Sequence, residues 1–215
     1  MTKDTKKRVH RYFQYIIIVL IVSSALVAGI VFLNFNNFMN KEGEVVINSN
    51  EFYTLRGKPT DLQRALFKEL TTELEKDKPS DLLLVEHVVK NFVADYYTWT
   101  NKQGPFDVGG SDFIFSLEGT NFYRSSRRYF YSEMANYINN NLKPEDLIEV
   151  ESIVTGGADY ASNYDYYGTE YNSFYIELSW TYKANELIDT SVFPTSGSFT
   201  VIVTPERRFE IARFY

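Results

Sequence analysis

The first hydrophobic segment of the chain is an uncharged run of nineteen residues from Tyr15 to Leu33 (YIIIVLIVSSALVAGIVFL). At ~1.5 Å of rise per residue, a helix of this length spans roughly 28 Å, which is close to the hydrocarbon thickness of a bilayer. A cleaved signal peptide would have a shorter apolar region followed by small residues, whereas the nearest small pair here, Val27 to Gly29, lies inside the run. The run therefore predicts one uncleaved transmembrane helix.

Charge around this run predicts its orientation. Residues 1–11 contain five Lys and Arg against one Asp, a net charge of +4 on the amino side. By the positive-inside rule we expect a cytoplasmic tail over 1–14, a transmembrane helix over 15–33 and the rest of the chain outside the cell membrane. The polar, Asn-rich start of 34–60 (NFNNFMNKEGE) suggests a stalk, so that the extracytoplasmic domain would be 61–215.

Beyond the stalk, helical periodicity appears in three segments. Thr60 and Gln63 fit a capping box, and leucines recur at every fourth position from Leu62 to Leu74. An apolar stripe from Val85 to Trp99 follows a possible cap at Ser80 or Asp81. The helices are expected over 61–76, over 81–100, and from Ser125 or Ser126 to about Asn141.

The period then changes from 3.6 to 2, which is typical of strands with one buried face. Four segments alternate in this way: 147–154, 173–184, 198–204 and 208–214. Three helices followed by at least four antiparallel strands predict an α+β fold, in which the helices pack on one face of a curved antiparallel sheet.

Composition narrows the function. The chain has 22 basic and 28 acidic residues, a net charge of −6, and residues 12–215 alone carry −10. A body of that sign repels phosphates, so direct nucleic-acid binding is not expected. The chain contains no cysteine, which excludes disulfides and thiolate metal sites.

Catalytic, cofactor and metal signatures are not found in the sequence. His10 and His87 would lie on opposite sides of the membrane, and His87 is expected to have a structural role on the flank of its helix. DVGGSD (107–112) lacks the ligand ladder of a calcium loop. Asp95 and Asp107 are the candidate carboxylates at a cavity edge, with Asp95 expected to face the edge or solvent because it precedes Tyr96 by ~100° of helix.

The stretch DYYTWTNKQGPFDVGG (95–110) resembles a ligand loop, but its parts favour a structural corner. Tyr96 and Trp99 complete the apolar stripe, so they are expected in the core. Gly104 and Pro105 are stop signals, and Phe106 is expected to fold back as an anchor. Gly109-Gly110 permits a positive φ or a close backbone approach.

Two clusters form a candidate partner-binding surface. Tyrosines crowd a polar segment expected to be a long hairpin tip, and exposed tyrosine is favoured at interfaces. Three arginines in RSSRRYF are expected to pair with local Asp and Glu, or to meet an acidic partner or wall polymer. The residues are Tyr160, Tyr164, Tyr166, Tyr167, Tyr171, Arg124, Arg127 and Arg128.

The order of elements resembles a known family. The helix VEHVVKNFVADYYTWTNK (85–102) and the strand YIELSWTYKA (175–184) look like the first long helix and a central strand of the bitopic assembly factors of bacterial conjugation and type IV secretion machines. Those proteins carry an outer domain of the nuclear transport factor 2-like (NTF2-like, cystatin-like) cone fold. The resemblance implies a non-catalytic scaffold that forms homo-oligomers and binds other envelope proteins. The alternative is an extracytoplasmic domain that binds a small ligand or cell-wall polymer.

Overall fold

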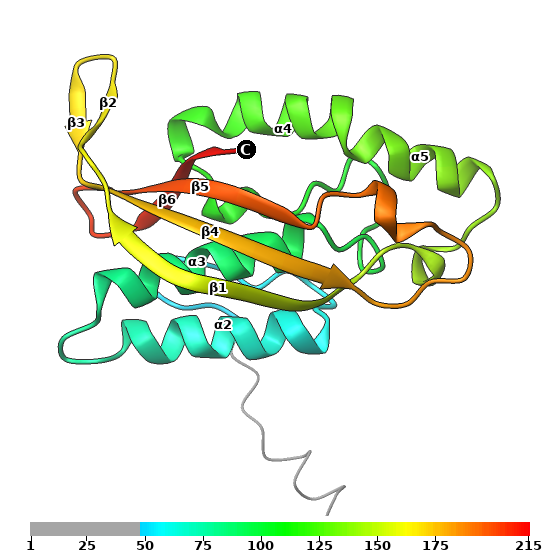
Figure 1. The fold of residues 1–215 in the computed structure, drawn as a ribbon, viewed down its shortest axis with the longest axis horizontal. Coiled ribbons are helices and arrows are strands. Elements are labelled where there is room, and N and C mark those ends of the chain that lie inside the picture. Colours follow the sequence, from blue (N-terminus) through cyan, green and yellow to red (C-terminus); the bar gives the residue numbers. More distant parts are fainter. Residues whose placement is uncertain (1–47) are drawn as a thin grey trace, which may run out of the picture. The chain divides into compact units, whose positions relative to one another are not determined.

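A computed structural model describes residues 48–215, which belong to one compact unit (Figure 1). The predicted tail, the apolar run 15–33 and most of the stalk lie outside these residues. Among the helices of residues 48–215, none combines the length and the apolar character that a membrane crossing requires.

Two helices begin the domain, at the positions that periodicity predicts. α2 (Asp61–Leu74) starts at the predicted capping box, in which Thr60 and Gln63 bond each other's backbone. α3 (Asp81–Tyr96) starts at Ser80, which accepts the N–H of Leu83. α3 ends four residues earlier than expected.

A pairing with a distant segment ends α3. The N–H of Trp99 donates to the carbonyl of Ile148 at 2.8 Å, and the Thr98 hydroxyl accepts the N–H of Val150 at 3.1 Å. These bonds hold residues 98–99 in an extended conformation beside the start of the sheet. Trp99 is fully buried as predicted, although it follows the helix and is not part of it.

The predicted third helix is two helices, α4 (Gly119–Tyr129) and α5 (Tyr131–Asn139), with the short 3₁₀ turn η2 (Ser116–Glu118) ahead of them. Ser125 and Ser126 therefore lie inside α4 and do not cap it. The chain bends at Phe130, whose ring contacts Tyr97 and Trp99 while the neighbouring Tyr131 is fully buried. The bend thus directs two consecutive aromatic residues into the core, which a straight helix would not do.

The four predicted strands form one antiparallel sheet in the order β1-β4-β5-β6, which confirms the α+β fold. Helix α3 lies behind the strands in Figure 1 and packs against them. Along β4, alternate side chains from Phe174 to Tyr182 are buried against the helices, while Glu177, Ser179 and Thr181 face outward. The strands are β1 (Val150–Tyr160), β4 (Ser173–Tyr182), β5 (Ser196–Val203) and β6 (Phe209–Phe214).

The tyrosine-rich segment forms a hairpin of its own, β2 (Tyr164–Tyr166) and β3 (Thr169–Tyr171). Its turn residues Tyr167 and Gly168 have φ of 49° and 85°. Positive φ at both central residues is the type I′ geometry that matches strand twist in two-residue hairpins.

Residues 48–60 belong to the domain, in contrast to the expectation that they form part of a stalk. Tyr53 is 2% exposed, and its hydroxyl donates to the carbonyl of Phe209 at 2.7 Å and accepts the N–H of the same residue at 3.1 Å. The hydrophobic residues of this segment show no helical or strand periodicity, because single side chains such as Tyr53 anchor it and no regular element does. The domain therefore includes residues that precede the first helix.

Candidate functional site

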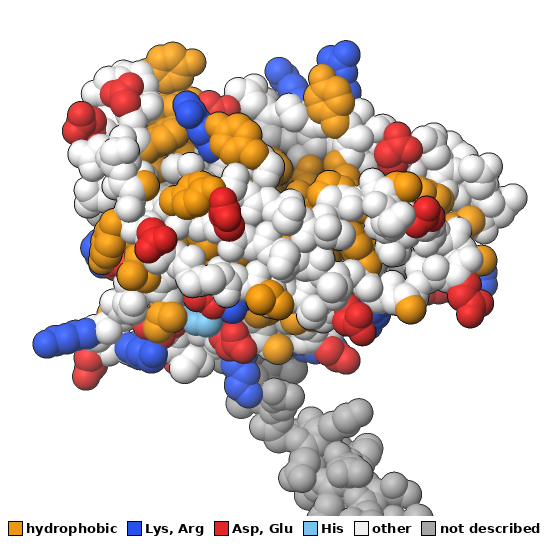
Figure 2. Space-filling view, viewed as in Figure 1, with side chains coloured by type: hydrophobic (Ala, Val, Ile, Leu, Met, Phe, Trp, Pro, Cys, Tyr) orange, Lys and Arg blue, Asp and Glu red, His pale blue; other side chains and the backbone are white. Residues whose placement is uncertain are grey.

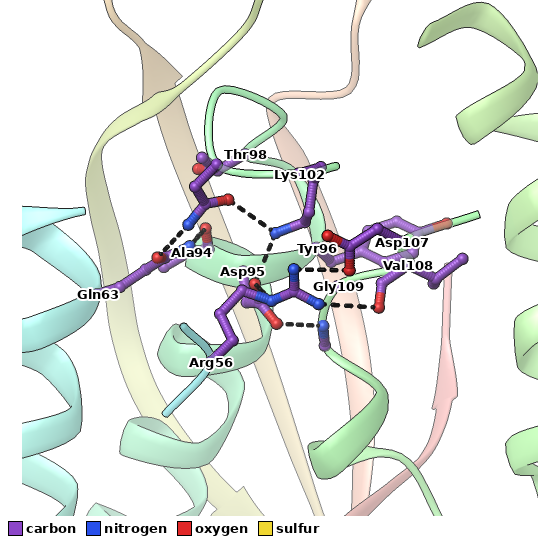
Figure 3. A network of polar contacts seen from close by, with 12 residues as sticks. Arg56, Gln63, Ala94, Asp95, Tyr96, Thr98, Lys102, Asp107, Val108 and Gly109 are labelled. Atoms are coloured by element: carbon purple, nitrogen blue, oxygen red, sulfur yellow. Dashed lines mark hydrogen bonds and ion pairs between the residues drawn. The ribbon is translucent and has the colours of Figure 1, made fainter. Parts of the chain in front are cut away.

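Asp95, at the end of α3, lies at the centre of a charged network inside the domain (Figure 3). Its Oδ1 is 2.7 Å from the Nζ of Lys102 and 2.9 Å from the Nε of Arg56, and its Oδ2 accepts the N–H of Gly110 at 2.6 Å. The Lys102 side chain is fully buried. Asp95 is therefore largely covered, with 17% of its side chain exposed, and it lies at the edge of a small cavity.

The early end of α3 explains this arrangement. Because the helix stops at Tyr96, the loop after it folds back over Asp95 and brings Lys102 and Gly110 to the carboxylate. The predicted segment of helix would have carried Lys102 away. Asp107 joins the same network: it accepts from Arg56 Nη1 at 2.8 Å and from the N–H of Gln103 at 2.9 Å.

The network is a poor site for acid-base chemistry. Burial alone would raise the pKa of Asp95, but Lys102 and Arg56 outweigh it and lower that pKa. Burial also lowers the pKa of Lys102, against the opposing effect of Asp95. The adjoining cavity, beside Arg56 and Asp95, measures about 10 Å³, roughly the space of one water. The network of Asp95, Arg56, Lys102 and Asp107 is therefore structural. We call these four residues the clasp.

The corner at 95–110 is confirmed, with one change. A Cβ on Gly109 would lie 2.2 Å from the carbonyl oxygen of Asp95, and Gly110 has φ of 73°. The N–H of Gly109 donates to the buried Tyr131 hydroxyl at 2.8 Å. Phe106 is 58% exposed, so the predicted anchor is wrong; the buried apolar side chain of this segment is Val108, which is 6% exposed.

No group of three or more His, Cys, Asp or Glu side chains within residues 48–215 is arranged to hold a metal ion. His87 is largely covered on the flank of α3, with Nδ1 3.7 Å from Glu69.

A second candidate site is a groove of about 490 Å³ between α4 and β6. In Figure 2, hydrophobic side chains are visible in the hollow below α4. The groove has an aromatic floor and a polar helical wall. Tyr96 and Phe122 lie at the floor, Asn121, Ser125 and Tyr129 line the α4 side, and Arg213 and Phe214 line the β6 side.

The structure brings the tyrosine hairpin to one end of this groove. Tyr166 and Tyr171 both pack edge-on against Phe115, with ring centroids 5.0 and 5.5 Å away. The Tyr166 hydroxyl donates to Glu118, which lines the groove, and this bond raises the pKa of Tyr166 to about 12. The Arg213 guanidinium lies 5.1 Å above the Tyr164 ring.

The hairpin is therefore a docked element: Tyr164, Tyr166 and Tyr171 are half-buried, whereas Tyr167 at the turn is 92% exposed. Tyr160, at the end of β1, is 72% exposed, with its ring centroid 5.1 Å from that of Phe174.

The arginines of α4 were expected to form ion pairs with nearby Asp and Glu, and they do not. Arg124, Arg127 and Arg128 are exposed, and within residues 48–215 none of them forms an ion pair with Asp or Glu. Instead, Arg127 lies over Tyr123 and Arg128 over Tyr129, at 5.7 and 5.5 Å from the ring centroids. The two predicted clusters thus meet at one groove, the hairpin through the bond of Tyr166 to Glu118 and the arginines through Arg128 over Tyr129.

Sequence reasoning missed the β6 side of the groove. Arg213 and Phe214 stand in RFEIARF, whose alternation predicts a strand and gives no sign that the strand lies at a sheet edge.

Comparisons of this chain with known protein families, with characterised proteins and with solved structures found no match. The class that the structure defines is an α+β domain of helices packed on a curved antiparallel sheet. The resemblance to conjugation assembly factors stays a hypothesis.

Proposed function

We propose that the protein is a single-pass membrane protein whose outer domain is a non-catalytic scaffold of the NTF2-like cone type. In this proposal residues 15–33 anchor the chain, the tail is cytoplasmic, and the domain lies outside and binds other envelope proteins as a homo-oligomer. The resemblance in element order supports a place in a conjugative transfer (type IV secretion) machine.

One observation carries the scaffold proposal: the groove between α4 and β6 is bordered by exposed tyrosines and unpaired arginines, while the interior charges are paired and closed off. Exposed Tyr129 and the α4 arginines are residue types favoured at protein interfaces. A surface of this kind suits recognition, whereas the clasp around Asp95 gives a substrate no space.

A second candidate is the binding of a small ligand or cell-wall polymer in the same groove. The aromatic floor of Tyr96, Phe122 and Phe214 favours it, since such ligands lie on apolar surfaces with a few polar groups around them. The interior of the fold opposes an enclosed ligand cavity, because Trp99, Phe130 and Trp180 fill it with aromatic rings.

Chemical crosslinking in intact membranes tests the scaffold proposal. We expect adducts of the full chain with itself and with at least one other envelope protein. Recovery of monomers alone, under conditions that crosslink a known envelope complex in the same membranes, would contradict it.

Cysteine labelling tests the anchor separately, since the chain has no native cysteine. In intact cells, a membrane-impermeant maleimide is expected to label Ser191→Cys on the domain surface, and to label Thr2→Cys only after lysis. Labelling of both sites in intact cells, or of neither, would refute the proposed topology.

A further inference from the structure

We propose that the groove between α4 and β6 binds an extended acidic peptide segment of a partner protein, which adds a strand to the open edge of β6. This inference deepens the proposed function, because it assigns a partner chemistry to the same groove.

The edge of the sheet supplies the backbone groups for such a strand. β6 is the last strand in the order β1-β4-β5-β6. Ser198 and Tyr215 exchange both backbone hydrogen bonds, at 3.1 and 3.0 Å. In an antiparallel pair the next residues are not bonded to each other, so Phe214, opposite Phe199, points its N–H and C=O away from β5.

Within residues 48–215 other segments cover only the first half of this edge. The Tyr53 hydroxyl bonds the N–H and the C=O of Phe209. The neighbouring segment reaches β6 at Ile211, where Ile114 forms an isolated parallel bridge and the N–H of Phe115 donates to the Ile211 carbonyl at 2.9 Å. Beyond Ile211, residues 212–215 line the groove. Exposed strand edges are the sites at which extended peptides bind by strand addition.

The dimensions of the groove fit a short extended segment. From Glu118 to Tyr129, α4 runs ~16 Å along its axis, which is the length of about five residues of extended chain. Side chains of an added strand alternate between the two faces. On the inner face they would meet the apolar floor at Phe122 and Phe214.

Charge selects an acidic segment. Residues 48–215 carry 16 basic and 25 acidic residues, a net charge of −9, yet α4 has three arginines and no Asp or Glu. Arg128 lies over the ring of the groove-lining Tyr129, and Arg124 follows the groove-lining Asn121 at i+3, about 60° away around the helix. Arg213 borders the other wall.

One carboxylate, Glu118, also lines the groove. It accepts hydrogen bonds from Asn121 and from the Tyr166 hydroxyl, and these bonds lower its pKa. The three arginines therefore leave the groove rim with a net positive charge in an acidic domain. Such a rim attracts carboxylates and repels ammonium groups.

The test measures binding of labelled synthetic peptides to the purified full chain by fluorescence anisotropy. The acidic probe is Glu-Val-Glu-Phe-Glu-Val-Glu, and its matched control replaces every Glu by Lys. We expect the acidic peptide to bind at least about tenfold more tightly than the lysine peptide. The double variant Arg124→Glu, Arg128→Glu should reverse that preference.

A matched variant controls for general charge. Arg127 lies about 160° around α4 from both Ser125 and Tyr129, on the side away from the groove. Arg127→Glu should therefore change the affinity by no more than about twofold. An equal loss from Arg127→Glu and from the double variant would overturn the proposal.

Backbone methylation tests strand addition itself. Successive N–H groups of an added strand point alternately toward β6 and away from it. A single N-methyl group on the central Phe or on the neighbouring Glu should therefore weaken binding about tenfold at one position and spare it at the other.

Three results would overturn the inference: equal effects of the two methyl groups, equal affinities of the acidic and lysine peptides, or no binding of either peptide. Binding of poly(glycerol phosphate) but of neither peptide would assign the groove to a wall polymer and also overturn it. Membrane crosslinking distinguishes failure of this inference from failure of the scaffold proposal. If crosslinking captures partner proteins while neither peptide binds, the scaffold proposal survives and the peptide inference does not.

Discussion

At the scale of single residues, oppositely charged side chains lie together at the end of α3. Asp95 and Asp107 are balanced by Arg56 and Lys102, so the network has no net charge. Removing one member of a buried ion pair costs more than the pair itself contributes, because the remaining charge stays desolvated. The clasp fixes the segment before the first helix to the end of α3.

Asp95→Asn should accordingly lower the free energy of unfolding by about 3–5 kcal/mol, because Lys102 then remains buried without its carboxylate. The exposed Asp61→Asn is the control and should cost less than about 0.5 kcal/mol. Urea unfolding of the full chain in detergent, followed by the fluorescence of the buried Trp99 and Trp180, measures both. Equal midpoints for the two variants would refute the clasp.

Gly109→Ala tests the close approach of the loop to α3. Its Cβ would overlap the Asp95 carbonyl oxygen at 2.2 Å, and the neighbour is backbone that cannot rotate away. We expect a loss of about 3 kcal/mol or failure to accumulate, whereas Gly57→Ala, which has no atom within 4 Å of its Cβ, should stay within about 0.5 kcal/mol. A folded Gly109→Ala protein of unchanged stability would show that the corner is misdescribed.

His87 should make stability depend on pH. Burial lowers the pKa of His87, with Lys90 adding to the shift and Glu69 opposing it. Because the folded pKa lies below the unfolded value of about 6.5, the stabilisation is complete above that pH and is lost as pH falls through the folded pKa. His87→Gln should flatten the fall in unfolding free energy between pH 7 and pH 5; identical slopes in the two proteins would contradict this.

At the scale of elements, the sequence periodicity predicted α2, the start of α3 and all four strands of the main sheet. Each of these depends on local pattern, because one face of the element is apolar. The errors in the predicted helix ends are caused by contacts between residues far apart in the sequence. α3 ends where residues 98–99 pair with 148–150, and α4 bends into α5 so that Phe130 and Tyr131 both reach the core.

Asp95 shows why the candidate site was harder to predict than the fold. Its partner Arg56 comes from a segment without any periodicity, and Lys102 reaches it only because α3 ends early. The sequence around Asp95 therefore indicates neither of these two partners. The hairpin tyrosines and α4 arginines were recognised as clusters by composition, but their meeting at one groove depends on Phe115 and on the edge position of β6.

The docking of the hairpin predicts a specific element-level change. Phe115→Ala removes the ring against which Tyr166 and Tyr171 pack, so the β2–β3 hairpin should exchange its amide hydrogens faster and become cleavable by protease within 160–172. Phe106→Ala, which removes an exposed ring, is the control. Unchanged exchange in β2 and β3 of Phe115→Ala would mean that the hairpin is held by other contacts.

At the scale of the whole molecule, the domain of residues 48–215 has a closed interior and a groove beside the edge strand β6. The clasp and the aromatic core leave the groove between α4 and β6 as the place where the domain offers backbone groups, aromatic surface and positive charge together. The central claim is that this groove is where the protein binds its partner.

Site-specific photocrosslinking in intact membranes tests that claim most directly. A photoreactive phenylalanine replaces Tyr129 in the groove or, as the control, the exposed Thr72 on α2. The account predicts a partner adduct from position 129, its loss in the Arg124→Glu, Arg128→Glu background, and no such adduct from position 72. An equal yield at the two positions, or an adduct at 129 that persists after charge reversal, would contradict it.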